Sequence, residues 1–564
     1  MASREKNILS LLEDKTNSYS EKIALGIKTQ TGWNEYSYAG IGLMSRKLAS
    51  YLIDTIKVKR GECLAILSDS KPEYGACVFA SILAGMTTVP LDVKLTKYEL
   101  ISILKDCEPT VILIAQAHLN TAIALQQEIK TLKTIILMDE QAPTSYLPSI
   151  YSIPNNFNAK WRHRSKKSTA LIIYTSGTTG APKGVEISFG NMLSQLEALQ
   201  QPINAILNTK SVNILSILPM NHLFELTVGF ATFLNYGFSI YYANSLKPKD
   251  ISACMKEKQI NFMIVVPAFL KLLKTGIENE IKSQQQKTQK IFWTMFKIAK
   301  YIPFYSIKRL LFKKIHDKFG GKFIGCISGG APLDITVGEF FERIGIKVYQ
   351  GYGLSETSPV VCVNTTKRND LASVGEPLKN FEAKIDENNG ELLLKGPSVM
   401  KGYHNQIEMT KNVIDENGWL HTGDIATIKD GHIYITGRIK NMIVLNGGKK
   451  VFPEEVETIL EQSPLFAEVC TIGYKKDFGE KLGTEDIATI IVPSENLLKN
   501  YDDETIEKII NDEVKLLSQK LTQYKRPNLI FITKTPLPRT TTRKIKRNEV
   551  KELLNNTIFT KTLN

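Results

Sequence analysis

The feature that most constrains this chain is a short apolar run followed at once by a loop of glycines and hydroxyls. Residues 169–184 read TALIIYTSGTTGAPKG. The run Ala170–Tyr174 has the length and the Ile and Leu content of a buried strand. The glycines and hydroxyls after it expose backbone N–H and O–H groups that can surround an anion. Lys183 adds a positive charge suited to phosphate oxygens, so we predict a phosphate-binding loop over Thr175–Lys183.

Two other interpretations of this loop fit less well. A flexible Ser/Thr/Gly linker seldom follows a buried strand directly. The loop of P-loop nucleoside triphosphatases ends in Gly-Lys-Ser or Gly-Lys-Thr, whereas Lys183 stands between Pro182 and Gly184. The next segment, SFGNMLSQLEAL, predicts a helix that begins after Ser188. The loop is therefore expected to join a strand to a helix.

The length of the chain implies more than one domain. It has 564 residues, of which 43% are apolar and 23% are charged, as in ordinary globular proteins. Seven scattered cysteines form no CxxC pair, which argues against a zinc site or a disulfide framework and suits a reducing compartment. The charged start, MASREKNILSLLEDK, is unlike a secretory signal.

The first part of the chain alternates helical segments with short apolar strands. Strands are predicted at Cys63–Ser68 and Thr110–Ala115, a pattern typical of α/β units with a parallel sheet. The longest weakly polar run, residues 226–243, approaches the length of a membrane span. Asn235, Tyr236 and Gly237 interrupt it, so we expect a buried helix and then a strand.

The net charge of +14 suits nucleic acid, a membrane surface or an anionic substrate. No nucleic-acid-binding signature is present, so no nucleic-acid partner is expected. The charge is concentrated in residues 281–322, where eleven Lys or Arg accompany one acidic residue and many aromatics. Such a segment suits peripheral contact with an anionic membrane. The alternative is a surface helical hairpin whose aromatic side chains pack on the body of the protein.

Two further segments suit a nucleotide. An apolar strand is predicted to end at residues 328–330, Ser-Gly-Gly, where glycines let a flat ring approach the backbone. The segment 351–359 reads GYGLSETSP. Tyr352 offers an aromatic face to adenine, Ser355 offers a hydroxyl to phosphate, and Glu356 offers the hard oxygen that Mg²⁺ prefers.

Two later side chains suit a ribose. Asp424 ends the segment GWLHTGD, and Arg438 lies in DGHIYITGRIKN. A carboxylate can accept hydrogen bonds from both ribose hydroxyls, and an Arg can bridge ribose and phosphate. The spacing predicts two hairpin strands joined by a turn at Asp430-Gly431.

Taken together, these segments resemble the signatures of the adenylate-forming superfamily: acyl-CoA synthetases, peptide-synthetase adenylation domains and luciferases. The resemblance runs from about residue 10 to about residue 550, and residues 437–457 look closest to long-chain fatty acyl-CoA synthetases. It implies an α/β fold with a large N-terminal AMP-binding domain of several subdomains and mainly parallel sheets, residues 1–438. Residues 281–322 would be a helical insertion in that domain, and 439–564 would form a small mobile α+β domain.

The resemblance also implies ATP, Mg²⁺ and coenzyme A as ligands and a long-chain fatty acid as substrate. His222, at a turn into a helix, would lie near the acyl pocket and the incoming thiol, although a helix-start hydrogen bond explains it equally well. Glu356 and Thr178 would hold Mg²⁺. The implied nucleotide-binding residues are Thr175, Ser176, Gly177, Thr178, Thr179, Gly180, Lys183, Gly329, Gly330, Ala331, Tyr352, Gly353, Ser355, Asp424 and Arg438.

The C-terminal part matches the superfamily at three places. Lys440 matches the hinge position about which the small domain turns. Gly447-Gly448 would line a channel for pantetheine. Residues 536–547, PLPRTTTRKIKR, follow the pattern Pro-x-Thr-x-x-Gly-Lys-Ile-x-Arg, except that Arg543 replaces the usual Gly. Lys544 takes the catalytic position, where it would bridge the substrate carboxylate and the phosphate.

The implied reaction has two steps, formation of an acyl-adenylate and transfer of the acyl group to coenzyme A. Two alternatives stay open. One is an acyl-AMP ligase that delivers to an acyl carrier protein, and the other is a catalytically silent lipid-binding protein. A cytoplasmic location is expected, with peripheral contact at the inner face of a membrane.

Overall fold

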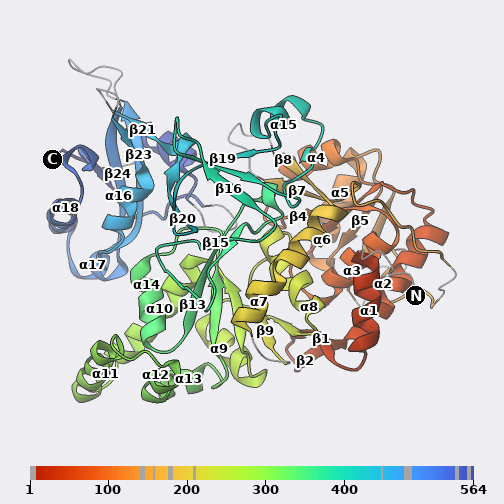
Figure 1. Ribbon diagram of the computed structural model, residues 1–564, viewed down its shortest axis with the longest axis horizontal. Helices are drawn as coiled ribbons and strands as arrows, with labels where there is room; N and C mark the ends of the chain where they lie inside the picture. Colours follow the sequence, from red (N-terminus) through yellow and green to blue (C-terminus); the bar gives the residue numbers. More distant parts are fainter. Residues whose placement is uncertain are drawn as a thin grey trace. The chain divides into compact units, whose positions relative to one another are not determined.

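The computed structural model describes residues 8–139, 147–155, 159–175, 182–207, 211–445, 449–475, 485–539, 545–555 and 560–563. The chain forms two compact units (Figure 1). The large unit comprises Met1–Glu382 with Leu394–Leu420, and the small unit comprises Ala383–Leu393 with His421–Asn564. These bounds divide the chain by the contacts that its residues make with one another. The boundary expected after residue 438 is a different quantity, the position of a hinge between two moving domains, and it stays a prediction.

The large unit contains two large sheets. One has nine strands in the order β15-β14-β13-β12-β11-β9-β10-β1-β2, and the other has seven in the order β18-β8-β7-β4-β3-β5-β6. The pairs from β9 to β13 and from β3 to β6 are parallel. The strand bounds are β1 Ile23–Lys28, β2 Trp33–Ser37, β3 Cys63–Leu67, β4 Thr87–Leu91, β5 Val111–Ile114, β6 Thr134–Leu137, β7 Thr169–Thr175, β8 Lys183–Ser188, β9 Asn213–Ser216, β10 Ser239–Tyr242, β11 Phe262–Val265, β12 Gly325–Ser328, β13 Lys347–Tyr352, β14 Cys362–Val363, β15 Glu376–Pro377 and β18 Gly402–Tyr403.

Helices cover these sheets (Figure 1). Their bounds are α1 Ile8–Ser18, α2 Tyr38–Ser50, α3 Pro72–Leu83, α4 Lys97–Cys107, α5 Leu119–Glu128, α6 Phe189–Ala198, α7 Gln200–Ile206, α8 Phe233–Asn235, α9 Pro248–Glu257, α10 Pro267–Lys282, α11 Gln286–Ala299, α12 Tyr305–Leu311, α13 Lys313–Lys318, α14 Ile335–Arg343 and α15 Ile407–Val413, with a π-helical segment η3 at Glu225–Thr232. The alternation of helices with parallel strands confirms the α/β class.

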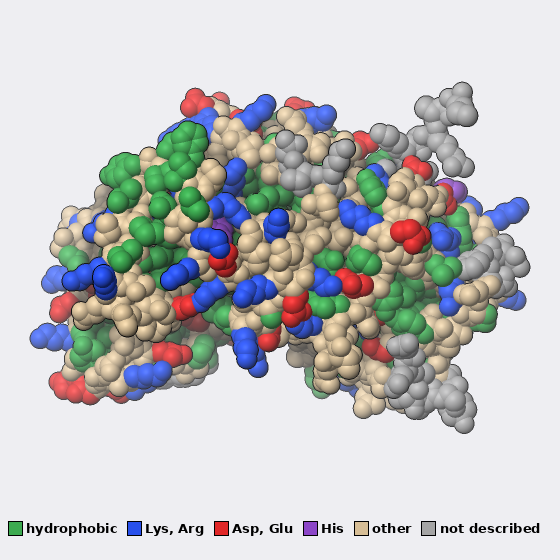
Figure 2. All heavy atoms as spheres, turned by 90° about the horizontal axis from the view of Figure 1, so that it is seen from below, with side chains coloured by type: hydrophobic (Ala, Val, Ile, Leu, Met, Phe, Trp, Pro, Cys, Tyr) green, Lys and Arg blue, Asp and Glu red, His purple; other side chains and the backbone are tan. Residues whose placement is uncertain are grey.

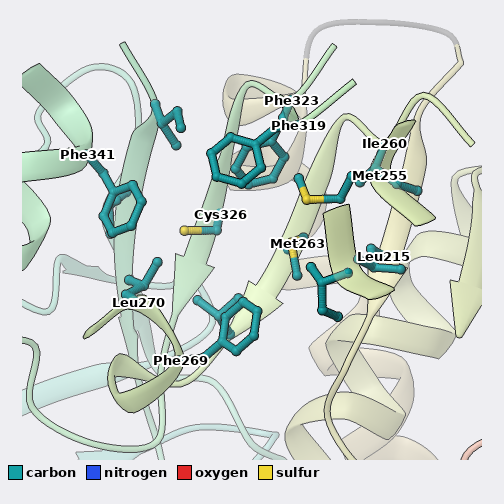
Figure 3. Close-up of a cluster of buried hydrophobic side chains, with 14 of the residues drawn as sticks. Leu215, Met255, Ile260, Met263, Phe269, Leu270, Phe319, Phe323, Cys326 and Phe341 are labelled. Carbon is teal, nitrogen blue, oxygen red and sulfur yellow. The ribbon is translucent and has the colours of Figure 1, made fainter. Parts of the chain in front are cut away.

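One buried cluster lies against the centre of the nine-stranded sheet. Met263 of β11 and Cys326 of β12 occupy neighbouring strands, and Phe269 of α10 and Phe341 of α14 belong to the same cluster (Figure 3). All seven cysteines of the chain are free and buried, as expected for a protein without a disulfide framework. Burial raises the pKa of the Cys63 thiol to about 12.

The prediction for the loop over Thr175–Lys183 needs one correction. The strand over 169–175 is confirmed, and Ser188 caps α6 by accepting a hydrogen bond from the Asn191 N–H. However, β8 lies between the loop and the helix and pairs antiparallel with β7. The loop therefore joins two strands of a hairpin. The segment KGVEIS is too short and too mixed in polarity for its strand character to stand out.

One further predicted element is confirmed. The weakly polar run over 226–243 forms η3, α8 and β10, a helical segment followed by a strand. None of the helices in the described ranges combines the length and the apolar character that crossing a membrane requires. The run over 262–273 forms β11 and then α10, with Pro267 at the first position of the helix, where its missing N–H is harmless.

The small unit is built on a sheet in the order β23-β24-β25-β26. A second sheet, β16-β17-β19-β20, lies mostly within it, together with the short pair β21-β22. The bounds are β16 Glu382–Ile385, β17 Glu391–Lys395, β19 Leu420–Lys429, β20 His432–Arg438, β21 Ile443–Val444, β22 Lys450–Val451, α16 Pro453–Leu460, β23 Phe466–Lys475, β24 Glu485–Pro493, α17 Glu495–Asn500, α18 Asp503–Ser518, β25 Leu529–Ile532, α19 Arg547–Asn555 and β26 Thr560–Leu563.

Candidate active site

Two predicted functional residues of the large unit meet on a third side chain, Tyr403. Strand β18 pairs antiparallel with β8, which places Tyr403 opposite Val185. The Nζ atom of Lys183 lies 5.6 Å from the centroid of the Tyr403 ring, within the range of a cation–π contact. The Tyr403 hydroxyl donates a hydrogen bond of 2.8 Å to Glu356 Oε1. The Lys predicted for phosphate and the carboxylate predicted for Mg²⁺ therefore contact the same tyrosine, one over its ring and the other at its hydroxyl.

The neighbours of Tyr403 are fixed by a charged network around Glu186. One carboxylate oxygen lies 2.7 Å from His404 Nδ1, and the other accepts hydrogen bonds from Lys401 Nζ at 2.9 Å and Thr169 Oγ1 at 2.7 Å. The hydrogen bond with His404 is the main reason why the pKa of Glu186 falls to about 2, and the same bond raises the pKa of His404. The network attaches residues 401–404 to β8, and so holds Tyr403 beside Lys183.

The backbone of Glu356 is also fixed next to this region. Its carbonyl oxygen accepts a 2.7 Å hydrogen bond from the Met400 N–H. Glu356 lies in a 3₁₀ turn, Ser355–Thr357, that follows β13. A side chain at Gly353 would place its Cβ 1.8 Å from the Pro359 carbonyl oxygen, so only Gly fits there. The end of β13 and the turn after it therefore have one tightly determined path.

The glycines after β12 lie beside the turn that carries His222. A Cβ atom on the buried Gly329 would come within 3.0 Å of the Phe224 ring, and Gly330 has a φ of +83°. The backbone N–H of His222 donates to the Pro219 carbonyl at 3.1 Å, which fixes the turn before the helix. Both explanations of the His222 side chain, a helix-start hydrogen bond and a role beside the thiol, stay predictions.

Glu225, which the sequence did not single out, is fully buried three residues after His222. Ser216 Oγ donates a 2.6 Å hydrogen bond to its Oε1. Burial raises the pKa of Glu225 to about 7. It also lies at the start of the π-helical segment η3, a kind of helix often found at functional sites. Glu225 is therefore a second titratable group in this part of the chain.

The small unit contains the two residues predicted for ribose. They are paired across β19 and β20, and Arg438 Nε lies 2.7 Å from Asp424 Oδ1. The turn Asp430-Gly431, with φ of +48° and +80°, joins the two strands, which confirms the predicted hairpin. Lys440 is exposed in the next turn, Ile439–Asn441. The hairpin thus places a carboxylate and a guanidinium side by side at one end of its strands.

The segment predicted to carry the catalytic Lys is attached at both ends. Arg539 and Ile545 form an antiparallel bridge, and the Lys546 N–H donates to the Pro538 carbonyl at 2.9 Å. Arg547 pairs with the carboxylates of Glu457 and Glu454 and donates to the Thr471 carbonyl. Burial opposes the charge of Arg547, but the Glu457 carboxylate outweighs it and raises the pKa of the guanidinium.

Nine residues of the predicted machinery lie outside the described residues. Their roles stay predictions: Ser176, Gly177, Thr178, Thr179, Gly180, Gly447, Gly448, Arg543 and Lys544. The described residues Thr175 and Lys183, at the two ends of the loop, are paired across β7 and β8. They hold the ends of the predicted phosphate loop together.

The metal chemistry of Glu356 can be judged from its surroundings. Within the described part of the chain, no group of three or more His, Cys, Asp or Glu is arranged to hold a metal ion. Mg²⁺ usually needs only one or two protein carboxylates when phosphate oxygens and water supply the other ligands. Glu356 has one oxygen on the Tyr403 hydroxyl and lies near the Lys predicted for phosphate. A single carboxylate in this place fits Mg²⁺ bound together with a nucleotide.

Comparison with known proteins agrees with this arrangement. Residues 12–404 match the family described as AMP-binding enzyme, which is more than half of the chain. The chain belongs to this family. Residues 440–560 match the AMP-binding enzyme C-terminal domain. Together the two matches cover most of the chain. The resemblance inferred from residues 169–184 and 351–359 is confirmed.

Curated relatives of this AMP-binding enzyme include ligases with two kinds of acceptor in their names. The chloroplastic long-chain-fatty-acid–[acyl-carrier-protein] ligase of Arabidopsis thaliana is 27% identical over 91% of this chain and 80% of that protein. The long-chain-fatty-acid–CoA ligase of Escherichia coli is 27% identical over 90% of this chain and 88% of that protein.

Solved structures show the same fold. ATP-bound MatB from Rhodopseudomonas palustris superposes with a TM-score of 0.78 at 22% identity, covering 98% of this chain and 99% of that chain. A fatty acyl CoA synthetase of Mycobacterium tuberculosis gives a TM-score of 0.68 at 22% identity over 98% and 99%. The predicted fold class, α/β with a separate C-terminal domain, is confirmed.

Tyr403 and the Glu186 network are two features of this AMP-binding enzyme that its sequence does not predict. Residues 401–404 lie more than 200 positions after β8, and the pairing of β18 involves only two residues. No local pattern indicates so short a strand. The one available signal is the mixture of Lys, Tyr and His in KGYH, which is polar yet contains an aromatic residue.

Proposed function

We propose that this AMP-binding enzyme activates a long-chain fatty acid with ATP and transfers the acyl group to coenzyme A, releasing AMP and diphosphate. The observation that carries the proposal is the meeting of Lys183 and Glu356 at Tyr403. It joins the phosphate loop to the predicted metal carboxylate, as ATP chemistry requires. The acid substrate is suggested by the relatives, which are named as long-chain fatty acid ligases.

In the first step a carboxylate oxygen of the fatty acid attacks the α-phosphorus of ATP. The bond from that phosphorus to the diphosphate oxygen breaks, and acyl-AMP and diphosphate form. The carboxylate is already ionised, so no general base is needed. Two anions must approach each other, so the protein has to supply positive charge where negative charge builds up. Lys183 supplies positive charge to the β- and γ-phosphates, and Lys544 supplies it to the reacting carboxylate and the α-phosphate.

The remaining residues position the nucleotide. Glu356 and Thr178 would hold Mg²⁺, which when bound neutralises negative charge on the phosphate oxygens. Tyr352 and the backbone at Gly329–Ala331 take the adenine, and the paired Asp424 and Arg438 take the ribose. Gly353 allows the tight backbone path after β13. Ser355 offers its hydroxyl to a phosphate oxygen.

In the second step the sulfur of coenzyme A attacks the acyl carbonyl carbon. The carbon–oxygen bond to AMP breaks, a thioester forms, and the thiol proton passes to solvent. We assign the hinge for this step to Lys440 and the thiol channel to Gly447-Gly448. His222 lies in the turn just before the helical residues that begin at Leu223, three positions before Glu225, and we assign it to the acyl and thiol side of the site.

A small apolar cavity suggests where the chain of the fatty acid goes. It lies between α1, α2, α3, α6 and η3, has a volume of about 50 Å³, and is lined by twelve apolar residues out of fifteen. Leu226 and Phe230 of the lining lie on the helix that follows His222. Typical ligand pockets measure about 300–1,000 Å³, so a long chain requires side chains such as Phe230 to move aside.

The decisive experiment is ATP–diphosphate exchange with fatty acids of increasing length. Lys544→Ala should lower the exchange rate by about 100-fold or more, because positive charge at the reacting phosphate is lost. Thioester formation from supplied acyl-AMP should be largely unchanged in the same variant. Lys546→Ala is the matched control, since Lys546 pairs on the surface with Glu549 at 2.7 Å. Exchange at the wild-type rate in Lys544→Ala would refute the assignment.

The second candidate function is transfer of the acyl group to an acyl carrier protein. The Arabidopsis relative favours it, because its name states this acceptor. Both candidates share the first step, so ATP–diphosphate exchange does not separate them. Competition between coenzyme A and holo-acyl carrier protein for enzyme-bound acyl-AMP separates the two candidates. Failure of every fatty acid to release diphosphate would instead favour a catalytically silent lipid-binding protein.

A further inference from the structure

The helices α11 and α12 expose an unusual set of apolar side chains. Among the described residues, nineteen large apolar side chains are exposed, and seven of these lie within residues 291–311. Monomeric proteins rarely expose contiguous apolar patches larger than roughly a few hundred Å² unless the patch has a partner. The seven are Ile291, Ile298, Tyr301, Phe304, Ile307, Leu310 and Leu311. From these residues we propose that α11, α12 and the segment between them form a docking surface for an anionic lipid membrane.

The spacing of the apolar residues puts them on one side of α12. Phe304, Ile307 and Leu310 recur every three residues, and so follow one face of the helix. Leu310 is 73% exposed and Phe304 is 64% exposed. Tyr301, in the segment before the helix, is 81% exposed. The three most exposed side chains of this surface are thus large and apolar or aromatic, as expected for groups that insert into a bilayer.

The opposite side of the same helices is firmly attached to the protein. Phe312 is buried, and Phe292 and Phe296 pack against the core cluster of the large unit. Lys308 is buried, and its Nζ donates to the Glu342 carbonyl at 3.2 Å. Arg309 donates to the carbonyls of Gly321 and Phe323. These contacts fix which side of α12 faces outward, so the exposure of the apolar side is not a result of loose packing.

Positive charge surrounds the apolar side chains. Residues 281–316 contain no Asp or Glu. Exposed lysines lie along α11 and just after it, at positions 287, 290, 297 and 300. The nearest acidic residue that follows, Asp317, pairs with Lys313 at 2.8 Å. Figure 2 views the molecule from the side where α11–α13 lie in Figure 1, and it shows hydrophobic side chains grouped among Lys and Arg side chains.

This combination favours a lipid surface over other occupants. An anionic bilayer offers negative headgroups to the lysines and an apolar layer directly beneath them to Phe304 and Leu310. A second copy of the chain would bring two basic surfaces together and so oppose like charges. An acidic protein would satisfy the lysines, but it would have to cover seven large apolar side chains as well.

The proposal does not depend on the proposed function, since none of these residues belongs to the candidate active site. Binding is measured on the full chain without substrate, by flotation with vesicles of phosphatidylglycerol and phosphatidylcholine in equal parts. Vesicles of phosphatidylcholine alone test the need for negative charge. We expect binding to the anionic vesicles only, with a marked loss at about 0.5 M salt, where charges are screened beyond a few Å.

Three variants test the two chemical components separately. The apolar variant, which combines Tyr301→Ser, Phe304→Ser and Leu310→Ser, should bind anionic vesicles at least about tenfold more weakly. The charge variant, which combines Lys287→Gln, Lys290→Gln, Lys297→Gln and Lys300→Gln, should lose about fivefold in vesicle affinity per lysine that contacts the headgroups. The matched control, Tyr98→Ser with Ile407→Ser, removes two side chains exposed elsewhere on the large unit and should bind within twofold of the wild type.

Several results would overturn the proposal. These are equal vesicle binding by the apolar variant and the wild type, equal binding to neutral and anionic vesicles, or no binding by the wild type. A dimer that dissociates in the apolar variant would assign the surface to a second copy instead. Capture of an acidic protein through this surface, with vesicle binding unaffected by the variants, would assign it to that protein. Thermal unfolding midpoints equal to the wild type would show that the variants are folded.

Discussion

Two regions of the large unit differ in whether their charged groups are paired and whether their apolar side chains are exposed. Around β8 and β18 the charged groups satisfy each other, as Glu186 does with His404 and Lys401. On α11 and α12 the lysines have no acidic neighbour in sequence, and apolar side chains such as Phe304 are exposed. The first region fixes the geometry of a few atoms, as a small-molecule site requires. The second offers a broad surface to something outside the protein.

The largest expected effect is a difference in stability between substitutions on the buried side and on the exposed side of the segment that contains α11 and α12. Phe312 is 3% exposed and Phe304 is 64% exposed, although only eight residues separate them. Phe312→Ala should lower the free energy of unfolding by about 3–5 kcal/mol, because it leaves a cavity in the core. Phe304→Ala should change it by no more than about 0.5 kcal/mol. Denaturant unfolding of both variants checks this, and equal destabilisation would contradict the assigned orientation.

The next effect concerns the carboxylate that meets Tyr403. Glu356→Gln keeps an oxygen that can accept the Tyr403 hydrogen bond but removes the negative charge. We expect a loss of about 100-fold in fatty acid-dependent ATP–diphosphate exchange, with a higher requirement for Mg²⁺. A titration of the exchange rate against Mg²⁺ measures this. An unchanged rate and an unchanged Mg²⁺ requirement would remove Glu356 from the site.

A smaller effect is expected in the Glu186 network, and it depends on pH. The pKa of Glu186 is lowered to about 2, so its contribution to stability is present above its ordinary range near pH 4.5 and is lost as the pH falls toward 2. The pKa of His404 is raised, so its contribution is present below about pH 6.5 and is lost as the pH rises through the raised value. The pair therefore stabilises the fold most between about pH 4.5 and pH 6.5.

Removal of one partner tests this pH dependence. Glu186→Gln should lower the free energy of unfolding by about 1.5–3 kcal/mol in that pH window, since a charged hydrogen bond is lost. The difference from the wild type should shrink toward pH 2 and above neutral pH. Unfolding measured across the pH range checks the shape, and a difference that stays constant with pH would show that the network is not the cause.

The smallest effect on activity should come from the hydroxyl of Tyr403. Tyr403→Phe keeps the ring next to Lys183 but removes the hydrogen bond to Glu356. Such a bond is typically worth about 0.5–1.5 kcal/mol, so kcat/KM for ATP should fall by about two- to tenfold. Steady-state kinetics with ATP as the varied substrate measure this. A loss as large as that of Glu356→Gln would mean that Tyr403 itself contacts the substrate.

Much of the fold could be predicted because its signals are local. The strand over 169–175, the cap at Ser188, the Asp430-Gly431 turn and the helix starts at Pro267 and Pro453 each follow from neighbouring residues. Strand β8 was missed because six residues of mixed polarity carry almost no periodicity.

The contacts of the candidate site could be predicted only in part. The residue types at Lys183 and Glu356 indicated phosphate and Mg²⁺, but nothing in the sequence showed that both side chains contact Tyr403. That contact depends on a two-residue pairing between distant segments, which only the folded chain determines. For the same reason the sequence identified the basic and aromatic character of residues 281–322 but left open which aromatics pack inward.

The burial of all seven cysteines has a practical consequence. Thiolate is the reactive form of cysteine, and burial raises the pKa of all seven groups and so keeps them as unreactive thiols. If coenzyme A is the acceptor, as we propose, a colour reagent for thiols should therefore report its disappearance with little background from the folded enzyme. A cysteine introduced in place of Tyr301 would be a single reactive position for attaching a fluorophore, and its emission would report directly on whether that residue enters lipid.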